Sequence, residues 1–274
     1  MRYVASLPGK HRFYRKEFAM SAKLKVFTFN LRIDNDGDGI NIFDNRAERI
    51  YECIDTYKPD LIGFQEGNPY MRSCLRDNLR DYTIVGCGRD KHYRGESAAI
   101  AFKNNVFELI SLETFWLSAQ PHIPGTCYGY DQSPYPRVCT SALLKHNDCE
   151  KPFWFFNTHL DHKGKTARLL GALQIIQYIS DRPEKFILTG DFNAQPDAPE
   201  IKVFAEQGMG IVDATVTLGG TFHKFGALES PHKIDYIFTN GICDEKESFI
   251  VPDEGVDGIY ISDHYPVCAL IEME

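Results

Sequence analysis

The sequence predicts a single α/β domain in which two packed β-sheets are covered by helices. Short runs of β-branched and aromatic residues recur along the chain, and turn residues bound them, as expected of strands. Segments with helical spacing of apolar residues lie between several of these runs. The 274-residue chain has no internal repeat and no low-complexity linker, so its mixed strands and helices favour one layered domain.

The predicted strands share an apolar, β-branched or aromatic core that stops abruptly at polar or turn residues. LKVFTFN and FWFFNTHL are typical examples. In chain order, the predicted strands are residues 24–30, 60–66, 82–88, 97–103, 138–146, 153–160, 185–192, 233–240 and 265–273.

Three helices are predicted between these strands. Residues 45–60 place apolar side chains on one face and stop at Pro59. Residues 165–181 repeat Leu and Ile at helical spacing. Residues 198–208 begin with a Pro and end with a Gly, which are the residues favoured at those two positions.

The composition favours a soluble globular domain in a reducing compartment. The eight cysteines form no C-x-x-C pair. No secretory signal and no membrane-length apolar run occurs, so we expect a cytoplasmic protein without a membrane partner. We also expect a monomer. The net charge of −8 does not support a nucleic-acid partner, although a local basic groove would be compatible with it.

The first 22 residues are basic and lack clear periodicity. We expect a separate N-terminal extension over residues 1–22 and a single folded domain over residues 23–274.

An acidic loop over residues 32–45 resembles a calcium-binding EF-hand loop. Asp34, Asp36 and Asp38 alternate and Gly39 follows, but the last position of the pattern holds Asn45 where a bidentate Glu is needed. A predicted strand precedes the loop, whereas an EF-hand needs a helix there. We therefore expect a turn beside a metal pocket and no calcium site.

Several predicted strands end in metal-binding or catalytic residue types. Asn30, Glu66, His159, Asp191 and Asn193 all follow apolar strand residues. His159 and Asp161 are two residues apart, as are Asp191 and Asn193, so in extended chain each pair would face one side. Carboxylate and amide oxygens suit a hard cation, so this shared strand edge predicts a site for Mg²⁺, with Mn²⁺ able to substitute.

Asp235 lies within an otherwise apolar run near the C-terminus and needs a partner if buried. His264 could be that partner, because a carboxylate that accepts the imidazole N–H fixes its tautomer and raises its basicity. A bond from Asp235 to backbone or to Lys233 is the alternative.

These segments together resemble the endonuclease/exonuclease/phosphatase superfamily with the deoxyribonuclease I-like fold. The markers FTFNLR, FQE, NTHLDH, TGDFNAQP, TFHKF, IDYIF and SDHYPV occur in order between about Lys25 and Glu272. The loop DNDGDG and the segments GTFH and TFWLS are similar to a bacterial branch of metal-dependent hydrolases. The resemblance implies a four-layer αββα sandwich with two mainly antiparallel sheets flanked by helices.

The resemblance also implies roles for the matching residues. Asn30 and Glu66 would bind the catalytic Mg²⁺, and Asp263 would lie at the metal. The reaction would be in-line attack of water on phosphorus, with His264 as general base and Asp235 orienting it. Asp191 and Asn193 would orient the water and the phosphate. His159 would donate to the phosphoryl oxygens.

Substrate contacts are implied at four further positions. Glu96 and Arg137 fall where the family often has site residues, Arg46 could face the phosphate, and His223 could touch substrate. A surface ion pair is the alternative for Arg137, and an exposed loop histidine without a role is the alternative for His223.

The substrate itself is expected to be a small nucleotide or another small phosphoester. Inositol polyphosphate phosphatases carry an Arg two positions after the Asn of the GDxN motif, where this chain has Gln195. A nuclease acting on DNA or RNA ends is the main alternative. A non-catalytic relative is disfavoured, because Glu66 and His264 are both present.

Overall fold

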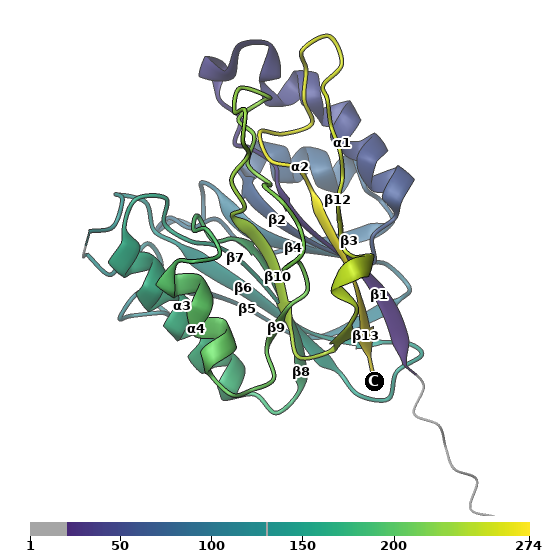
Figure 1. Cartoon of the computed structure of the whole chain (residues 1–274), viewed down its shortest axis with the longest axis vertical. Coiled ribbons are helices and arrows are strands. Elements are labelled where there is room, and N and C mark those ends of the chain that lie inside the picture. The colour runs from purple at the N-terminus through teal and green to yellow at the C-terminus, as the bar shows by residue number, and fades with distance from the viewer. Residues whose placement is uncertain (1–20, 130) are drawn as a thin grey trace, which may run out of the picture.

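A computed structural model describes residues 21–129 and 131–274 of the chain. Three hydrophobic layers hold this part of the chain together. One layer, which includes Val26 and Ile187, lies between the two sheets. The other two lie between each sheet and its helices, and they include Phe27 and Ile175. Two β-sheets therefore pack face to face, with helices on both outer faces, which confirms the predicted four-layer αββα sandwich (Figure 1).

The first sheet has the strand order β11-β13-β1-β2-β4-β3, and β12 also pairs with β13. Its strands are β1 (Ala22–Asn30), β2 (Leu61–Gly67), β3 (Tyr82–Val85), β4 (Ser97–Lys103), β11 (Ile242–Cys243), β12 (Phe249–Ile250) and β13 (Val267–Met273). Only β1 and β2 are parallel among these pairs of the described chain.

The second sheet has the order β5-β6-β7-β8-β10-β9. Its strands are β5 (Phe107–Trp116), β6 (Val138–His146), β7 (Phe153–His159), β8 (Lys185–Asp191), β9 (Val212–Asp213) and β10 (Asp235–Thr239). Strands β7 and β8 are parallel, and the remaining pairs within residues 107–239 are antiparallel.

Helices α1 (Phe43–Tyr57) and α2 (Pro69–Asn78) cover the first sheet, whereas α3 (Lys165–Ser180) and α4 (Pro199–Glu206) cover the second (Figure 1). Short 3₁₀ turns occupy Asp36–Asn41 and Glu245–Glu247. The sequence-based predictions missed α2, β5 and the two-residue strands β9, β11 and β12. The Asn68-Pro69 pair could have indicated α2, because Asn68 accepts a hydrogen bond from the Met71 amide at 2.9 Å and Pro69 opens the helix.

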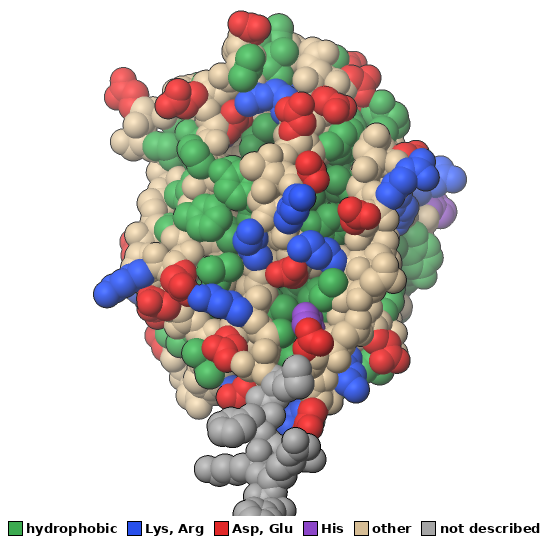
Figure 2. Space-filling view, turned by 90° about the vertical axis from the view of Figure 1, so that its right-hand side faces the viewer, with side chains coloured by type: hydrophobic (Ala, Val, Ile, Leu, Met, Phe, Trp, Pro, Cys, Tyr) green, Lys and Arg blue, Asp and Glu red, His purple; other side chains and the backbone are tan. Residues whose placement is uncertain are grey.

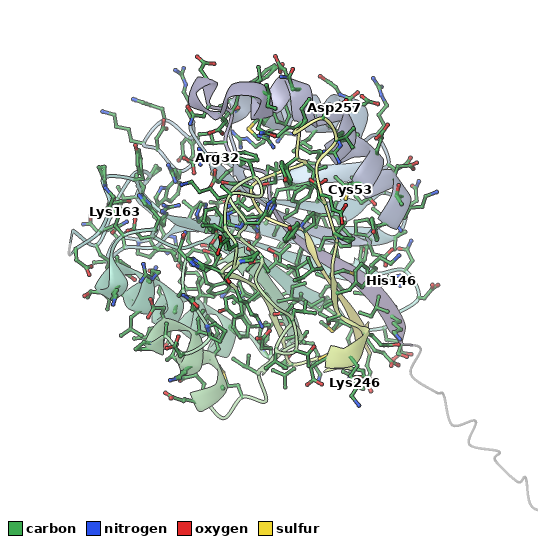
Figure 3. All side chains as sticks on the ribbon, turned by 45° about the horizontal axis from the view of Figure 1, so that its top comes forward. Arg32, Cys53, His146, Lys163, Lys246 and Asp257 are labelled. Carbon is green, nitrogen blue, oxygen red and sulfur yellow. The ribbon has the colours of Figure 1, made fainter. Side chains whose placement is uncertain are left out.

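Both parallel pairs bring the ends of their strands to one edge of the molecule. Each pair is joined by a crossover that contains a helix, α1 for β1 and β2, and α3 for β7 and β8. Asn30 is opposite Gln65 in the first sheet, and His159 is opposite Asp191 in the second. Figure 3 shows Lys163, shortly after β7, on the opposite side of the molecule from His146, which ends the antiparallel β6.

A buried amide network connects the two sheets. Asn157 in β7 donates to the backbone carbonyls of Phe64 and Ala99, both at 2.8 Å. Its carbonyl oxygen accepts from Gln65 at 2.7 Å and from the Thr189 hydroxyl at 3.1 Å. These bonds satisfy polar groups that would otherwise be costly to bury between the sheets, and they fix how the two sheets are placed relative to each other.

The acidic loop forms no EF-hand. A strand precedes it, and residues 36–41 form a 3₁₀ turn. The guanidinium of Arg32 donates to both carboxylate oxygens of Asp38, at 2.8 and 2.9 Å, and Asp34 accepts a hydrogen bond from the Phe43 amide. Asp34 and Asp38 thus have partners within the loop and its neighbours, as expected of a structured turn.

Residues 1–20 of the expected N-terminal extension lie outside the described residues, and β1 begins at Ala22. No helix within the described part of the chain is long and apolar enough to cross a bilayer. On the face shown in Figure 2, acidic and basic side chains are interspersed, and no continuous basic stripe is visible.

Gly63 tests the inter-sheet network. A Cβ atom at this position would lie 2.0 Å from the Thr189 hydroxyl and 2.5 Å from the Asn157 carbonyl oxygen. Gly63→Ala should therefore lower the free energy of unfolding by about 1–3 kcal/mol or more, measured by urea denaturation. Gly219→Ala is the matched control, because nothing lies within 4 Å of its Cβ position. Equal stability of both variants would contradict the role assigned to this network.

Candidate active site

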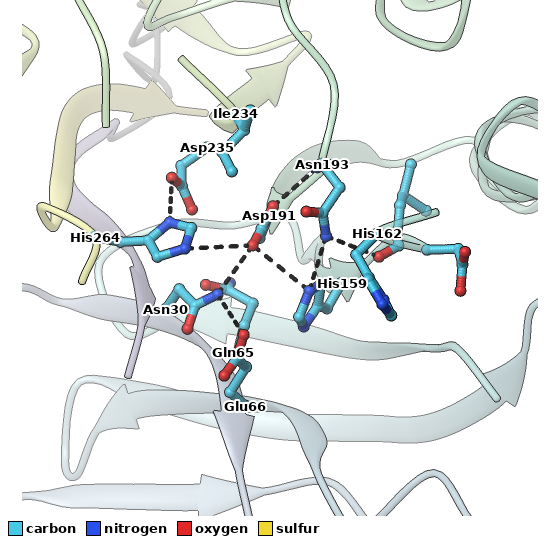
Figure 4. A network of polar contacts seen from close by, with 12 residues as sticks. Asn30, Gln65, Glu66, His159, His162, Asp191, Asn193, Ile234, Asp235 and His264 are labelled. Atoms are coloured by element: carbon cyan, nitrogen blue, oxygen red, sulfur yellow. Dashed lines mark hydrogen bonds and ion pairs between the residues drawn. The ribbon is translucent and has the colours of Figure 1, made fainter. Parts of the chain in front are cut away.

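Polar side chains from both sheets meet at the shared strand edge (Figure 4). Asn30 ends β1 in the first sheet, and Asp191 ends β8 in the second. The Asn30 side-chain amide donates to Asp191 at 2.9 Å and to Glu66 at 3.2 Å. Three residues predicted for the site from separate strands therefore meet through the Asn30 amide, and they form the centre of the site. Glu66 and Asp191 also line a cavity of about 540 Å³.

Two residues of the candidate site, Glu66 and Asn193, have left-handed backbone conformations. The φ angle is 65° at Glu66 and 49° at Asn193. Asn adopts this region readily, but Glu does so at a cost, and such strained residues cluster at functional sites. At Glu66 the conformation coincides with an irregularity in the pairing of β2 with β4, and the carboxylate accepts a hydrogen bond from the Ile33 amide at 2.7 Å. The bend directs Glu66 toward Asn30.

His264 pairs with Asp235, as the sequence predicts. The distance between His264 Nδ1 and Asp235 Oδ2 is 2.8 Å, and the same carboxylate oxygen accepts from the Thr221 hydroxyl at 2.5 Å. The other ring nitrogen, Nε2, lies 3.8 Å from Asp191 and 3.9 Å from Asp263. Burial lowers the pKa of His264, but Asp235, Asp263 and Asp191 outweigh it and raise the pKa to about 10.

His159 lies across the cavity from His264 and contacts Asn193. Its Nε2 is 3.0 Å from the Asn193 amide nitrogen and 3.5 Å from Asp191. Burial, together with the positive charges of Arg137 and Arg89, holds the pKa of His159 well below its usual range. His159 is therefore a neutral imidazole at neutral pH.

Asp161 does not share a face with His159, contrary to the prediction. The strand β7 ends at His159, and the chain then turns. The Asp161 carboxylate accepts hydrogen bonds from Ser133 and from the amides of Lys163 and Gly164. It therefore fixes a loop and does not face the centre of the site.

The donor set at the centre fits a hard divalent cation. Ligand atoms of Glu66, His159 and Asp191 lie within 4.8 Å of one another. Burial, followed by repulsion from Asp235, raises the pKa of Asp191 to about 7, and burial also raises the pKa of Asp263. A cation among these crowded carboxylates would offset their mutual repulsion, and oxygen donors are the ligands that Mg²⁺ and Mn²⁺ prefer.

The opposite wall of the cavity is basic. Arg137 and Glu96, both predicted for substrate binding, lie there, together with Arg89 and His162. Arg89 was not predicted, because it comes from the irregular connection between β3 and β4 and no motif distinguishes it. Only the fold brings this arginine to the site.

Arg46 does not face the phosphate site, so this prediction is wrong. Its side chain is wholly buried. The guanidinium donates to four backbone carbonyls, those of Leu31, Arg32, Asn41 and Ile261. Burial lowers its pKa to about 10. Arg46 therefore ties the end of β1 to the segment that carries His264, and it has a structural role.

His223 is buried as well and is not among the residues that line the cavity, contrary to the prediction of a substrate contact. Its ring stacks on Tyr265 at a centroid distance of 4.0 Å. Its Nδ1 accepts a hydrogen bond from the Gly226 amide at 3.0 Å. Burial, assisted by the positive charge of His264, lowers the pKa of His223 to about 4.

The model of the endonuclease/exonuclease/phosphatase family matches residues 27–264 of the chain. An uncharacterised protein of Acanthamoeba polyphaga mimivirus is 25% identical over 254 residues, which cover 84% of this chain and 92% of the viral protein.

Solved structures share the fold. An endonuclease/exonuclease/phosphatase from Bacteroides vulgatus is 30% identical with a TM-score of 0.84, and the match covers 92% of this chain and 100% of that one. A mannosyl-6-phosphatase from Bacteroides thetaiotaomicron is 28% identical with a TM-score of 0.77, covering 90% and 99%.

Burial of neutral His223 predicts a pH-dependent contribution to stability. Because its folded pKa of about 4 lies below the usual value of 6.5, the contribution is complete above pH 6.5 and is lost as the pH falls toward 4. The stability advantage of the wild type over His223→Asn should therefore narrow between pH 7 and pH 4. Urea denaturation with EDTA at several pH values measures it, and a difference independent of pH would contradict the assignment.

Proposed function

The chain belongs to the endonuclease/exonuclease/phosphatase family, and from this we propose that it is a Mg²⁺-dependent hydrolase of a small phosphoester. The observation that carries the proposal is the convergence of Asn30, Glu66, Asp191 and the His264–Asp235 pair at one strand edge. Hydrolysis of phosphoester bonds is the chemistry of this family, and the chain is a hydrolase of that class.

Asn30, Glu66, Asp191 and Asp263 would hold the cation, and Mn²⁺ could substitute for Mg²⁺. Bound there, the cation would offset negative charge on the phosphoryl oxygens. In the geometry described, the amide nitrogen of Asn30 faces Glu66 and Asp191, so Asn30 would turn its amide to present oxygen to the cation. Arg32, whose backbone N–H donates to that oxygen at 2.9 Å, would then lose this partner.

His264 would accept the proton of the attacking water at Nε2, and Asp235 would hold the ring by its Nδ1–H. Asp191 and Asp263 help to keep His264 protonated while their charges are not offset. A cation that offset the charges of Asp263 and Asp191 would lower the pKa of His264 and so favour the neutral imidazole that a base requires. Asn193, in contact with His159, would position the phosphoryl group opposite the water.

A small substrate is favoured over a long polyanion. The net charge of −8 gives no support for an extended basic track along which a long polyanion could bind. Hydrolysis of DNA or RNA ends is the alternative, and a substrate panel that includes nucleotides and oligonucleotides distinguishes the two.

The proposal predicts activity that depends on both the metal and the base. With Mg²⁺ or Mn²⁺, the protein should hydrolyse bis-p-nitrophenyl phosphate or members of a nucleotide and phosphomonoester panel, and EDTA should abolish this. His264→Ala and Asn193→Ala should each lower kcat about 10²–10⁴-fold, as expected for loss of a general base or a positioning group.

His92→Ala is the matched control, because His92 is exposed. It should retain wild-type kcat. Activity that survives EDTA, or that persists in the His264→Ala variant, would contradict the mechanism.

A further inference from the structure

Two buried arginines, Arg89 and Arg137, line the cavity of the candidate site. Arg89 and Arg137 are only 8% and 4% exposed, although guanidinium groups are rarely buried without partners. Both arginines line the same cavity as His159 and Asp191, so they lie near the proposed reacting centre. The roles proposed above for Asp191, Asn193 and His264 involve neither arginine.

Arg137 has hydrogen-bond donors without acceptors. Its Nη2 contacts His162 Nδ1 at 2.9 Å. Its Nε and Nη1 atoms are buried and have no hydrogen-bond partner among the described residues. Asp161 lies 3.6 Å from Nε, too far for a hydrogen bond, and its oxygens are already occupied by Ser133 and two backbone amides. Buried N–H groups without acceptors are costly, so these point to a ligand that supplies oxygen atoms.

Arg89 is held in place by other contacts. Its guanidinium donates to Glu96 and lies over the ring of Tyr135, 4.8 Å from the ring centroid. Its backbone carbonyl accepts a hydrogen bond from the Trp116 indole at 2.6 Å. Since Glu96 contacts only the Nη2 atom, the other N–H groups of Arg89 remain for a ligand in the cavity.

We propose that Arg89 and Arg137 together bind the non-bridging oxygens of a terminal, dianionic phosphate, so that the enzyme selects phosphomonoesters over phosphodiesters. This inference rests on the proposed function and specifies its substrate class. Glu96 and Asp161 offset the two positive charges, so selection comes mainly from directed N–H groups and not from net charge.

Selection of monoesters over diesters would follow from the number of charged oxygens that each ester offers. A monoester presents three equivalent oxygens with two negative charges, which suit bidentate guanidinium groups. In a diester, an alkyl group blocks one of these oxygens. A site built to hydrogen-bond a group rejects the analogue that lacks it, because its buried donors are then left unpaired.

The test compares p-nitrophenyl phosphate with methyl p-nitrophenyl phosphate, which share a leaving group and differ by one methyl group and one charge. At pH 8 with Mg²⁺, we expect Arg137→Gln and Arg89→Gln each to lower kcat/KM for the monoester about 10²-fold, and for the diester less than about 10-fold. Arg137→Lys, which keeps the charge but loses the planar fork, should not restore the preference. Arg80→Gln, at an exposed arginine, is the control.

A proportional loss for both esters in both variants would overturn the inference, as would a higher kcat/KM for the diester in the wild type. Phosphoester hydrolysis itself would still stand in either case.

A binding measurement separates this inference from the proposed function. In the magnesium-loaded protein, inorganic phosphate should raise the Tm of the wild type, whereas dimethyl phosphate should not, and the increase should disappear in both Gln variants. If neither ester is hydrolysed but this pattern appears, the proposed function fails and the dianion site stands. If phosphate leaves the wild-type Tm unchanged, or raises it equally in the variants, the inference fails.

Discussion

The side-chain amide of Asn157 is the contact on which the site geometry depends. It joins β7 to the backbone of β2 and β4, so the two sheets cannot slide without breaking buried hydrogen bonds. Gly63 permits this approach because it has no Cβ. Since Asn30 and Glu66 come from one sheet and His159 and Asp191 from the other, the position of one sheet against the other sets every distance across the site.

Electrostatic crowding follows from that arrangement. The parallel strands bring carboxylates together at one edge, and burial makes their charges costly. In the geometry described, the Asn30 amide and the His264 imidazolium offset part of the repulsion. The folding energy of the sandwich maintains this unfavourable cluster, whose acidic and His groups could hold a metal ion.

Much of the fold and of the candidate site could be predicted from the sequence, because strand ends carry a local signal. An apolar run that stops at Asn30 or Asp191 can be recognised without a structure, and so can a carboxylate such as Asp235 within an apolar run. Arg89 could not be recognised, since nothing near it in sequence shows which wall it reaches. Arg46 was misassigned because a helix-opening arginine near a site looks the same whether it faces a ligand or four backbone carbonyls.

Arg46 and Ser262 show that the site depends on contacts between distant parts of the chain. The Ser262 hydroxyl donates to the Asn30 carbonyl, 232 positions away, and Arg46 links Leu31 to Ile261 across a similar separation. Contacts between such distant segments carry a loop-closure cost that the rest of the fold must offset. The geometry of the candidate site therefore depends on the whole sandwich, because contacts between the end of β1 and the segment that leads into β13 bring Asn30 and His264 to the same site.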